Sequence, residues 1–271
     1  LVGSEMCIRD SICLILHTSG TTSRPKQVQL SCMNIISSAL NIARVLQLER
    51  EDKGMNIMPL FHIHGLIASL LSSIVTGSSV ICTSGFNALT FYGNIKTFKP
   101  TWITAVPTMY QAILSRALRN KEIIQASSLR LLRSSSAAMP VATIEALENA
   151  FQCPVIEAYG MTEASHQMAS NFLDSLRKPG SVGKSAGPEI ALFRDNKLIT
   201  VANTVGEIVI RGSNVTKGYK NNNKANKENF FDGWFKTGDL GKFDEDGFLS
   251  VSYTHLRAHE TPEHRGWRLV L

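Results

Sequence analysis

The hydrophobic positions of this 271-residue chain fall into two successive patterns. In the first, short apolar runs alternate with segments whose apolar residues recur every three or four positions, the patterns of buried strands and amphipathic helices. The predicted strands span residues 12–16, 55–60, 80–82, 101–105, 129–133 and 155–159. The predicted helices span residues 31–46, 65–77, 91–98, 107–119 and 140–151, the first capped by Ser31 and the fourth begun by Pro107. This alternation predicts an α/β fold, with βαβ units around a mostly parallel sheet and functional sites at the C-terminal ends of its strands.

The helix after Ser31 is predicted to bury one apolar face. Its members are Ile35, Ile36, Ala39, Leu40, Ala43 and Leu46.

Beyond about residue 178 the second pattern begins, in which short alternating runs lie between Gly, Asn and Asp turns. The strands predicted there are residues 189–193, 197–200, 207–211 and 247–249. The sequence therefore predicts an αβ subdomain over residues 12–175 and a smaller β-rich subdomain over residues 176–249. The boundary is expected between residues 171 and 180.

The two ends of the chain carry a signal of another kind. Residues 6–10 and 251–255 can be encoded by opposite strands of one short DNA sequence, and residues 1–5 and 256–260 extend the match in a shifted frame. Such a sequence looks like a transposon-type sequencing adapter. We therefore interpret residues 1–11 and 250–271 as translated adapter, which leaves no natural terminus or targeting signal to interpret.

Composition narrows the class of protein and its partners. A hydrophobic fraction of 44% with 18% charged residues indicates a globular core. The net charge of +6 is spread along the chain and suits a small polyanionic ligand. The sequence contains no nucleic-acid motif and no apolar run of membrane length, so binding to nucleic acid or to a membrane is not expected. The widely spaced Cys13, Cys32, Cys82 and Cys153 are interpreted as reduced core thiols of a cytosolic type of compartment.

A loop rich in hydroxyl side chains follows the first predicted strand. It reads Leu16-His17-Thr18-Ser19-Gly20-Thr21-Thr22-Ser23-Arg24-Pro25-Lys26. Its hydroxyls, the backbone at Gly20 and the Lys26 ammonium could together hold a polyphosphate. The loop is not the common P-loop, because Pro25 precedes the lysine and Gln27 follows it. A Ser/Thr-rich turn between two strands would have the same composition.

Three further motifs follow in order. The small residues of Ser134-Ser135-Ser136-Ala137-Ala138-Met139-Pro140 would let a flat ring approach the backbone, although a plain strand-to-helix turn explains them equally. In Glu157-Ala158-Tyr159-Gly160-Met161-Thr162-Glu163, the tyrosine offers a stacking face, the threonine a phosphate contact and the last glutamate an oxygen ligand for Mg²⁺. The alternative there is a surface turn with an exposed glutamate. In Thr237-Gly238-Asp239, the carboxylate can accept from both hydroxyls of a ribose.

Taken in this order, the motifs resemble those of the adenylate-forming enzymes, which include acyl-CoA synthetases, aryl-CoA ligases, luciferases and peptide-synthetase adenylation domains. The usual loop of that family is T-S-G-T-T-G-x-P-K-G, from which this chain departs at Ser23 and Gln27. The resemblance covers residues 12–249. It implies attack of a small carboxylate on ATP to give acyl-AMP and pyrophosphate, then displacement of AMP by the CoA thiol, with ATP, Mg²⁺ and coenzyme A as cofactors. The family also has a segment before the loop and a C-terminal lid domain with a catalytic lysine, so this chain is expected to be a fragment that is inactive alone.

The resemblance assigns a role to each motif. It implies that Thr162, Glu163 and His62 are catalytic, with Glu163 as the metal ligand. The implied phosphate-binding residues are Thr18, Ser19, Gly20, Thr21, Thr22 and Lys26. The implied adenine- and ribose-binding residues are Ser136, Ala137, Ala138, Glu157, Ala158, Tyr159, Gly160 and Asp239.

Three histidines indicate the class of acid. His62 matches the family position that gates the acyl pocket, His64 has the alternative of a structural role, and His166 is untypical of fatty-acyl members. With Ser134 or Ser136, these imidazoles could hydrogen-bond a second, non-reacting carboxylate.

Together with the runs P-L-F-H-I-H-G-L and E-A-Y-G-M-T-E-A-S-H, the histidines make the chain resemble the oxalate–CoA ligase branch. A fatty acyl-CoA or 4-coumarate-type aryl-CoA synthetase and a non-catalytic nucleotide-binding protein stay as alternatives. A cytoplasmic location is expected, with a peroxisomal one left open by the missing termini.

Overall fold

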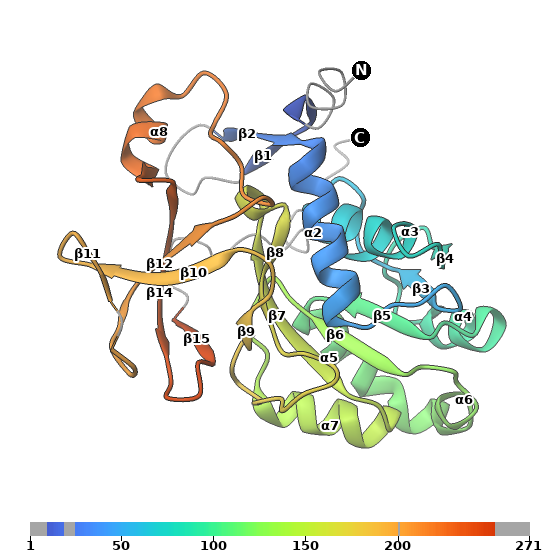
Figure 1. The fold of residues 1–271 in the computed structure, drawn as a ribbon. Helices are drawn as coiled ribbons and strands as arrows, with labels where there is room; N and C mark the ends of the chain where they lie inside the picture. The colour runs from blue at the N-terminus through green and yellow to red at the C-terminus, as the bar shows by residue number, and fades with distance from the viewer. Residues whose placement is uncertain (1–9, 19–24, 200, 253–271) are drawn as a thin grey trace, which may run out of the picture.

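The computed structural model describes residues 10–18, 25–199 and 201–252. Its strands form three sheets of two, seven and six strands, arranged as in Figure 1. The smallest sheet is a hairpin of β1 (Ile12–Thr18) and β2 (Lys26–Ser31), which flank the hydroxyl-rich loop.

The seven-stranded sheet has the order β4-β3-β5-β6-β7-β8-β9. Its members are β3 (Lys53–Asn56), β4 (Ser79–Cys82), β5 (Trp102–Ala105), β6 (Leu131–Ser134), β7 (Val155–Met161), β8 (His166–Ser170) and β9 (Lys184–Ser185). Strands β4, β3, β5, β6 and β7 are parallel, whereas β8 and β9 are antiparallel to their neighbours. This arrangement confirms the predicted α/β class with a mostly parallel sheet.

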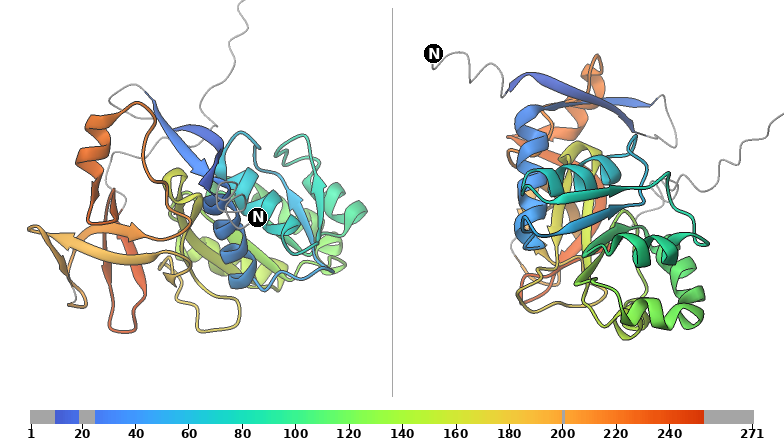
Figure 2. Two further views of the ribbon diagram at one scale, coloured as in Figure 1. Left: turned by 45° about the horizontal axis from the view of Figure 1, so that its top comes forward. Right: turned by 90° about the vertical axis from the view of Figure 1, so that its right-hand side faces the viewer.

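Helices cover both faces of this sheet, as the right-hand view of Figure 2 shows. One face carries α2 (Cys32–Val45), the π-helical stretch η1 (His64–Leu71) and α3 (Ser72–Ile74); the other carries α4 (Phe91–Phe98), α5 (Pro107–Ala117), α6 (Lys121–Gln125) and α7 (Val141–Phe151). Short 3₁₀ turns, η2 (Leu118–Asn120) and η3 (Thr162–Ala164), follow α5 and β7. Successive strand residues point to opposite faces, so Leu131 packs in the first core and Leu132 in the second.

The six-stranded sheet is antiparallel throughout and confirms the expected β-rich part. It comprises β10 (Glu189–Arg194), β11 (Lys197–Ile199), β12 (Gly206–Arg211), β13 (Phe230–Phe231), β14 (Trp234–Phe243) and β15 (Leu249–Ser252), with α8 (Asn223–Asn229) before β13. Residues 250–252, interpreted from the sequence as adapter, continue β15 and pair with β14. The hydrophobic core on the α2 face is continuous with this sheet, because it includes Ile208 and Phe235.

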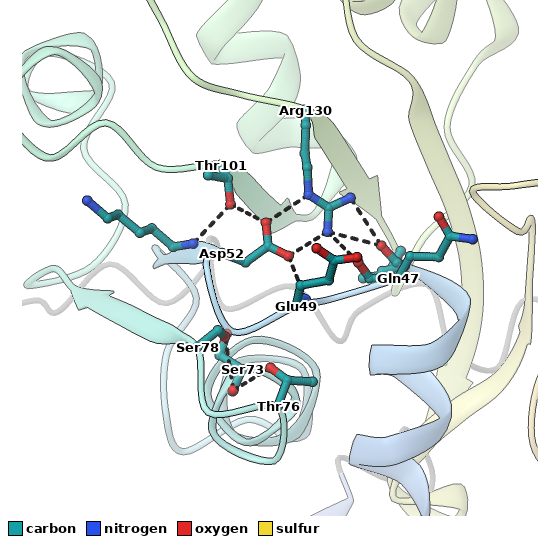
Figure 3. Close-up of polar contacts among 10 residues, drawn as sticks. Gln47, Glu49, Asp52, Ser73, Thr76, Ser78, Thr101 and Arg130 are labelled. Atoms are coloured by element: carbon teal, nitrogen blue, oxygen red, sulfur yellow. Dashed lines mark hydrogen bonds and ion pairs between the residues drawn. The ribbon is translucent and has the colours of Figure 1, made fainter.

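The Arg130 side chain joins the C-terminal end of α2 to the segment before β3. Arg130 donates to both carboxylate oxygens of Asp52, from Nε at 2.7 Å and from Nη2 at 2.6 Å, and to the carbonyls of Leu46 and Gln47 at the end of α2 (Figure 3). Thr101 donates to the same carboxylate at 2.6 Å. This clasp of Arg130, Asp52 and Thr101 fixes the C-terminal end of α2 against the N-terminal ends of β3, β5 and β6.

Some predicted details are wrong. Strand β1 is not buried, because it pairs with β2 alone among the described strands and leaves Ile12 48% and Ile15 38% exposed. In α2, Ile36 and Leu40 are each 50% exposed, although they were placed on the buried face. Their place is taken by polar residues that find buried partners: Ser38 accepts a hydrogen bond from the Gln167 amide, and the Asn34 side chain donates to two backbone carbonyls.

Two further expectations need correction. The strand predicted over residues 55–60 is β3 and ends at Asn56, whose side-chain oxygen accepts a hydrogen bond from the Met58 amide and turns the chain. Of the four described cysteines, all free, Cys153 is the buried one; Cys13 and Cys82 are exposed on strands of sheet edges. No helix of the described segments combines the length and the apolar character needed to cross a membrane.

Candidate active site

The two ends of the hydroxyl-rich loop lie side by side. Thr18 and Lys26 are register partners across β1 and β2, while Ser19, Gly20, Thr21 and Thr22 lie outside the described residues. The Lys26 ammonium lies 4.8 Å from the centre of the Tyr219 ring.

Tyr219 also contacts the predicted metal ligand. Its hydroxyl donates a 2.8 Å hydrogen bond to Oε1 of Glu163, and the carbonyl of Glu163 accepts from the Thr216 amide at 2.7 Å. Glu163 is 5% exposed in the turn η3, beside Thr162, which excludes the surface-turn alternative. Tyr219 thus joins the cation of the loop to the carboxylate of the third motif, a role that the sequence did not predict.

The predicted nucleoside residues meet between two sheets. The Tyr159 hydroxyl, on β7, donates a 2.5 Å hydrogen bond to Oδ2 of Asp239, on β14. A pocket next to β7 is lined by Ala137, Ala138, Glu157 and Ala158, together with Ser134, Met139, Gly180, Val182 and Val251. Ser134, which was expected to bind the acid, lines this pocket, and Ser136 is not part of the lining.

Glu157 is the titratable group of this pocket. Its Oε2 accepts a 2.9 Å hydrogen bond from the Gly180 amide. Burial raises the pKa of Glu157 to about 7, against the stabilising effect of that hydrogen bond on the charged form.

Of the predicted acid-binding residues, His62 lies just before η1, His64 is the first residue of η1, and His166 is the first residue of β8. The rings of His64 and His166 lie 5.0 Å apart, and His64 Nδ1 is 3.0 Å from the Ser136 hydroxyl. The backbone amide of His64 donates to Nδ1 of His62 at 3.1 Å. Burial lowers the pKa of all three imidazoles, and the nearby Arg133 guanidinium lowers the pKa of His64 and His166 further. These rings are therefore neutral at physiological pH.

Comparison with known proteins places this geometry in a family. The AMP-binding enzyme family matches residues 4–220. The chain belongs to the AMP-binding enzymes. It is 49% identical to oxalate–CoA ligase of Arabidopsis thaliana over 246 residues, which cover 89% of this chain and 48% of that protein. It is 46% identical to oxalate–CoA ligase of Saccharomyces cerevisiae over 244 residues, covering 89% of this chain and 44% of that protein.

Solved structures of AMP-binding enzymes share the fold. O-succinylbenzoate CoA synthetase from Bacillus subtilis, in complex with AMP, matches with a TM-score of 0.81 and 35% identity over 90% of this chain and 49% of that one. ATP-bound MatB from Rhodopseudomonas palustris matches with a TM-score of 0.83 and 31% identity over 90% and 48%. The chain thus spans about half the length of the relatives it matches.

The backbone conformation near the histidine cluster is unusual. Ser136 has φ 73° and His166 has φ 92°, both in the left-handed region that favours glycine. Residues held in such conformations cluster at functional sites. The neighbouring Gly160 is required for another reason, since a Cβ there would lie 1.8 Å from the His166 carbonyl oxygen.

Three buried residues beside His64 and His166 were not predicted as site residues from the sequence. Arg133 donates from Nη1 to the Thr104 hydroxyl at 3.2 Å and from Nη2 to Oε1 of Gln167 at 2.9 Å. All three are 0% exposed. The available signal was that two arginines, Arg130 and Arg133, interrupt the apolar strand predicted over residues 129–133.

Proposed function

We propose that the full-length protein containing this chain is an ATP-dependent carboxylate–CoA ligase that acts on oxalate. The observation that carries the proposal is the contact series Lys26–Tyr219–Glu163, which joins the phosphate loop to a buried carboxylate. The family and the relatives that are nearly half identical support the same reaction. In it, a carboxylate oxygen attacks the α-phosphorus of ATP, pyrophosphate leaves, and the CoA thiol then displaces AMP from the acyl group.

In this proposal, the residues of the first half-reaction position ATP and neutralise its charge. The loop from Thr18 to Lys26, with Thr162, holds the triphosphate. The Glu163 carboxylate fits Mg²⁺, a hard cation that is usually bound through one or two carboxylates plus the phosphates of the substrate. Within the described residues, no group of three or more His, Cys, Asp or Glu side chains gathers as a metal site. When bound, Mg²⁺ would offset the negative charge of the phosphate oxygens.

The nucleoside and the acid occupy opposite sides of β6 and β7 in this proposal. Asp239, oriented by Tyr159, accepts from the ribose hydroxyls, and the Ala137–Ala138 pocket receives adenine. His64, His166 and Ser136 hold the carboxylate of oxalate that does not react, and His62 lies at the entrance to that site. A fatty or aromatic tail would meet these polar groups instead of apolar ones.

The organisation of the chain enters the proposal as well. We assign residues 12–175 and 176–249 to two subdomains that share the nucleotide site. Because the chain spans about half of its relatives, the complete reaction is proposed for the full-length protein and not for this segment alone.

The test is a pyrophosphate-release assay on the full-length protein with ATP, CoA and a panel of acids. We expect turnover to be fastest with oxalate, and Glu163→Gln to lower it at least about 100-fold, since the variant lacks the carboxylate charge. Glu228→Gln, at an exposed position of α8, is the matched control and should retain full activity. Preference for a long or aromatic acid would replace oxalate by a fatty-acyl or aryl substrate. ATP binding without pyrophosphate release for any acid would leave a nucleotide-binding protein.

A further inference from the structure

The most unusual group of the acid side is a buried charge without a counter-ion. Arg133 is 0% exposed near the end of β6, and no carboxylate of the described residues forms an ion pair with it. Its Nε has no hydrogen-bond partner among the described residues. Burying a charge costs free energy of folding unless the charge is paired, so an unpaired buried guanidinium is expected to have a functional role.

One series of hydrogen bonds leads from Arg133 to Ser136. Thr104 is the register partner of Arg133 on β5, and its hydroxyl lies 3.2 Å from Nη1 of the arginine and 2.7 Å from Nε2 of His64. A guanidinium can only donate, so the Thr104 oxygen accepts there and its single proton is directed at His64 Nε2. Neutral His64 then carries its proton on Nδ1 and donates to Ser136, whose own proton is left for a ligand.

A second contact leads from Arg133 to His166. Nη2 of Arg133 lies 3.5 Å from Nδ1 of His166, at the long end of the hydrogen-bond range. Because the arginine donates, Nδ1 of the neutral ring is the acceptor and the proton lies on Nε2. That Nε2 is buried and has no partner among the described residues. Both series therefore end in a free donor, on Ser136 and on His166.

We propose that Arg133 is a positioning residue that selects a dicarboxylate, orienting Ser136 and His166 as donors and balancing the charge of the non-reacting carboxylate. This inference rests on the proposed ligase function and adds the residue that sets its acid preference. A monocarboxylate brings no second anion and leaves the buried guanidinium uncompensated. The site would therefore distinguish a dicarboxylate from a monocarboxylate of the same size by its charge.

Oxalate and oxamate are the probes for this test, because oxamate has nearly the same shape but a neutral amide in place of one carboxylate. In the full-length enzyme with ATP, Mg²⁺ and CoA, kcat/KM is measured for both acids. We expect the wild-type enzyme to prefer oxalate at least about 100-fold, the range for leaving a buried charged group unpaired. Arg133→Met should lower the oxalate value about 100-fold and change the oxamate value less than about 3-fold.

Two further variants separate the positioning effect of Arg133 from the effect of its charge and from a loss of folding. Thr104→Val removes the shared hydroxyl but keeps the guanidinium, and should raise KM for oxalate about 10-fold with little change in kcat. Arg133→Lys keeps the charge and should keep a preference for oxalate that Arg133→Met loses. The affinity of each variant for ATP reports whether the site has folded, and Thr104→Val keeps the inference testable if Arg133→Met does not fold.

The outcomes distinguish this inference from the function on which it rests. Equal losses for both acids in Arg133→Met, or an unchanged preference, would overturn the role of Arg133 while the wild-type preference upholds oxalate as the substrate. A wild-type enzyme that uses oxamate as well as oxalate would overturn the role of Arg133 and keep oxalate as a substrate. One that uses neither acid would overturn the oxalate assignment and the role of Arg133 together.

Discussion

Tyr159 and Asp239 lie on different sheets, and the 2.5 Å hydrogen bond between them joins the sheets at the proposed ribose site. We expect Tyr159→Phe to lower the free energy of unfolding by about 1–3 kcal/mol, because it removes a donor from a buried carboxylate. Since the carboxylate also loses its orientation, affinity for ATP should fall about 10-fold. Denaturant unfolding and ATP titration measure the two effects.

The control for that variant is Tyr92→Phe. The Tyr92 hydroxyl is also buried, but it donates to the carbonyl of Ile113, far from the nucleotide pocket. This variant should cost a similar free energy and leave ATP affinity unchanged. An equal loss of ATP affinity in both variants would contradict a specific role for the Tyr159–Asp239 contact.

Gly160, on β7, packs against His166 of the proposed acid site. In Gly160→Ala, the added Cβ would overlap the His166 carbonyl oxygen at 1.8 Å, so the turn between β7 and β8 must move. We expect a loss of about 1–3 kcal/mol of stability and of oxalate-dependent turnover. Gly93→Ala, in α4 with open space around the new methyl group, should be neutral or stabilising. Thermal unfolding of both variants checks this, and a neutral Gly160→Ala would refute the close approach.

Glu157 should make stability depend on pH near neutrality. Its pKa of about 7 lies above the value of 4.5 expected for an unfolded glutamate. Between these two values the folded state holds the proton more tightly, so this group destabilises the fold increasingly as pH rises from 4.5 to 7. Glu157→Gln removes that trend and should be more stable than the wild type at pH 8, by up to about 3 kcal/mol.

Melting curves from pH 4 to pH 8 measure the Glu157 effect. Exposed Glu145→Gln is the control and should leave the pH profile unchanged. If the wild-type and Glu157→Gln curves run parallel across that range, Glu157 does not titrate near neutrality.

The clasp of Arg130 and Asp52 should stabilise the fold at the N-terminal ends of β3 and β6, away from the proposed active site. Arg130→Ala leaves the buried Asp52 carboxylate without its charged partner and should cost about 3 kcal/mol. Arg130→Lys should recover part of that, since it keeps the charge but loses the bidentate geometry. Lys224→Ala removes an exposed 4.0 Å pair and should cost less than about 1 kcal/mol.

The same clasp predicts a response to acid. Burial acts to raise the pKa of Asp52, but hydrogen bonds from Arg130, Thr101 and the Glu49 amide outweigh it and lower the pKa below 3.8. A carboxyl with a lowered folded pKa stabilises the fold above its unfolded pKa, and this contribution is lost as pH falls through the folded value. Urea unfolding at pH 3 and pH 6 should therefore show a smaller cost of Arg130→Ala at pH 3. An equal cost at both values would contradict it.

The sequence predicted most of the helices and parallel strands, because each has a local period that reflects which side is buried. It missed β14, since Thr237, Gly238 and Asp239 have turn-like composition and lie at an irregularity between the residues of β14 that pair with β12. It misplaced the buried face of α2 because Asn34 and Ser38 find partners far along the chain. Arg133 was missed for the same reason: its partners Thr104 and Gln167 meet it only in the folded chain.

The hairpin that flanks the hydroxyl-rich loop is held by residues that are made much later in synthesis. The Thr216 hydroxyl donates to the Gln29 carbonyl across 187 residues, and Tyr219 bridges to Val28. During synthesis, the hairpin with its exposed Ile12 and Ile15 therefore stays unanchored until residues 216–219 have been made. A chain that stops before Thr216 therefore lacks these contacts to the hairpin.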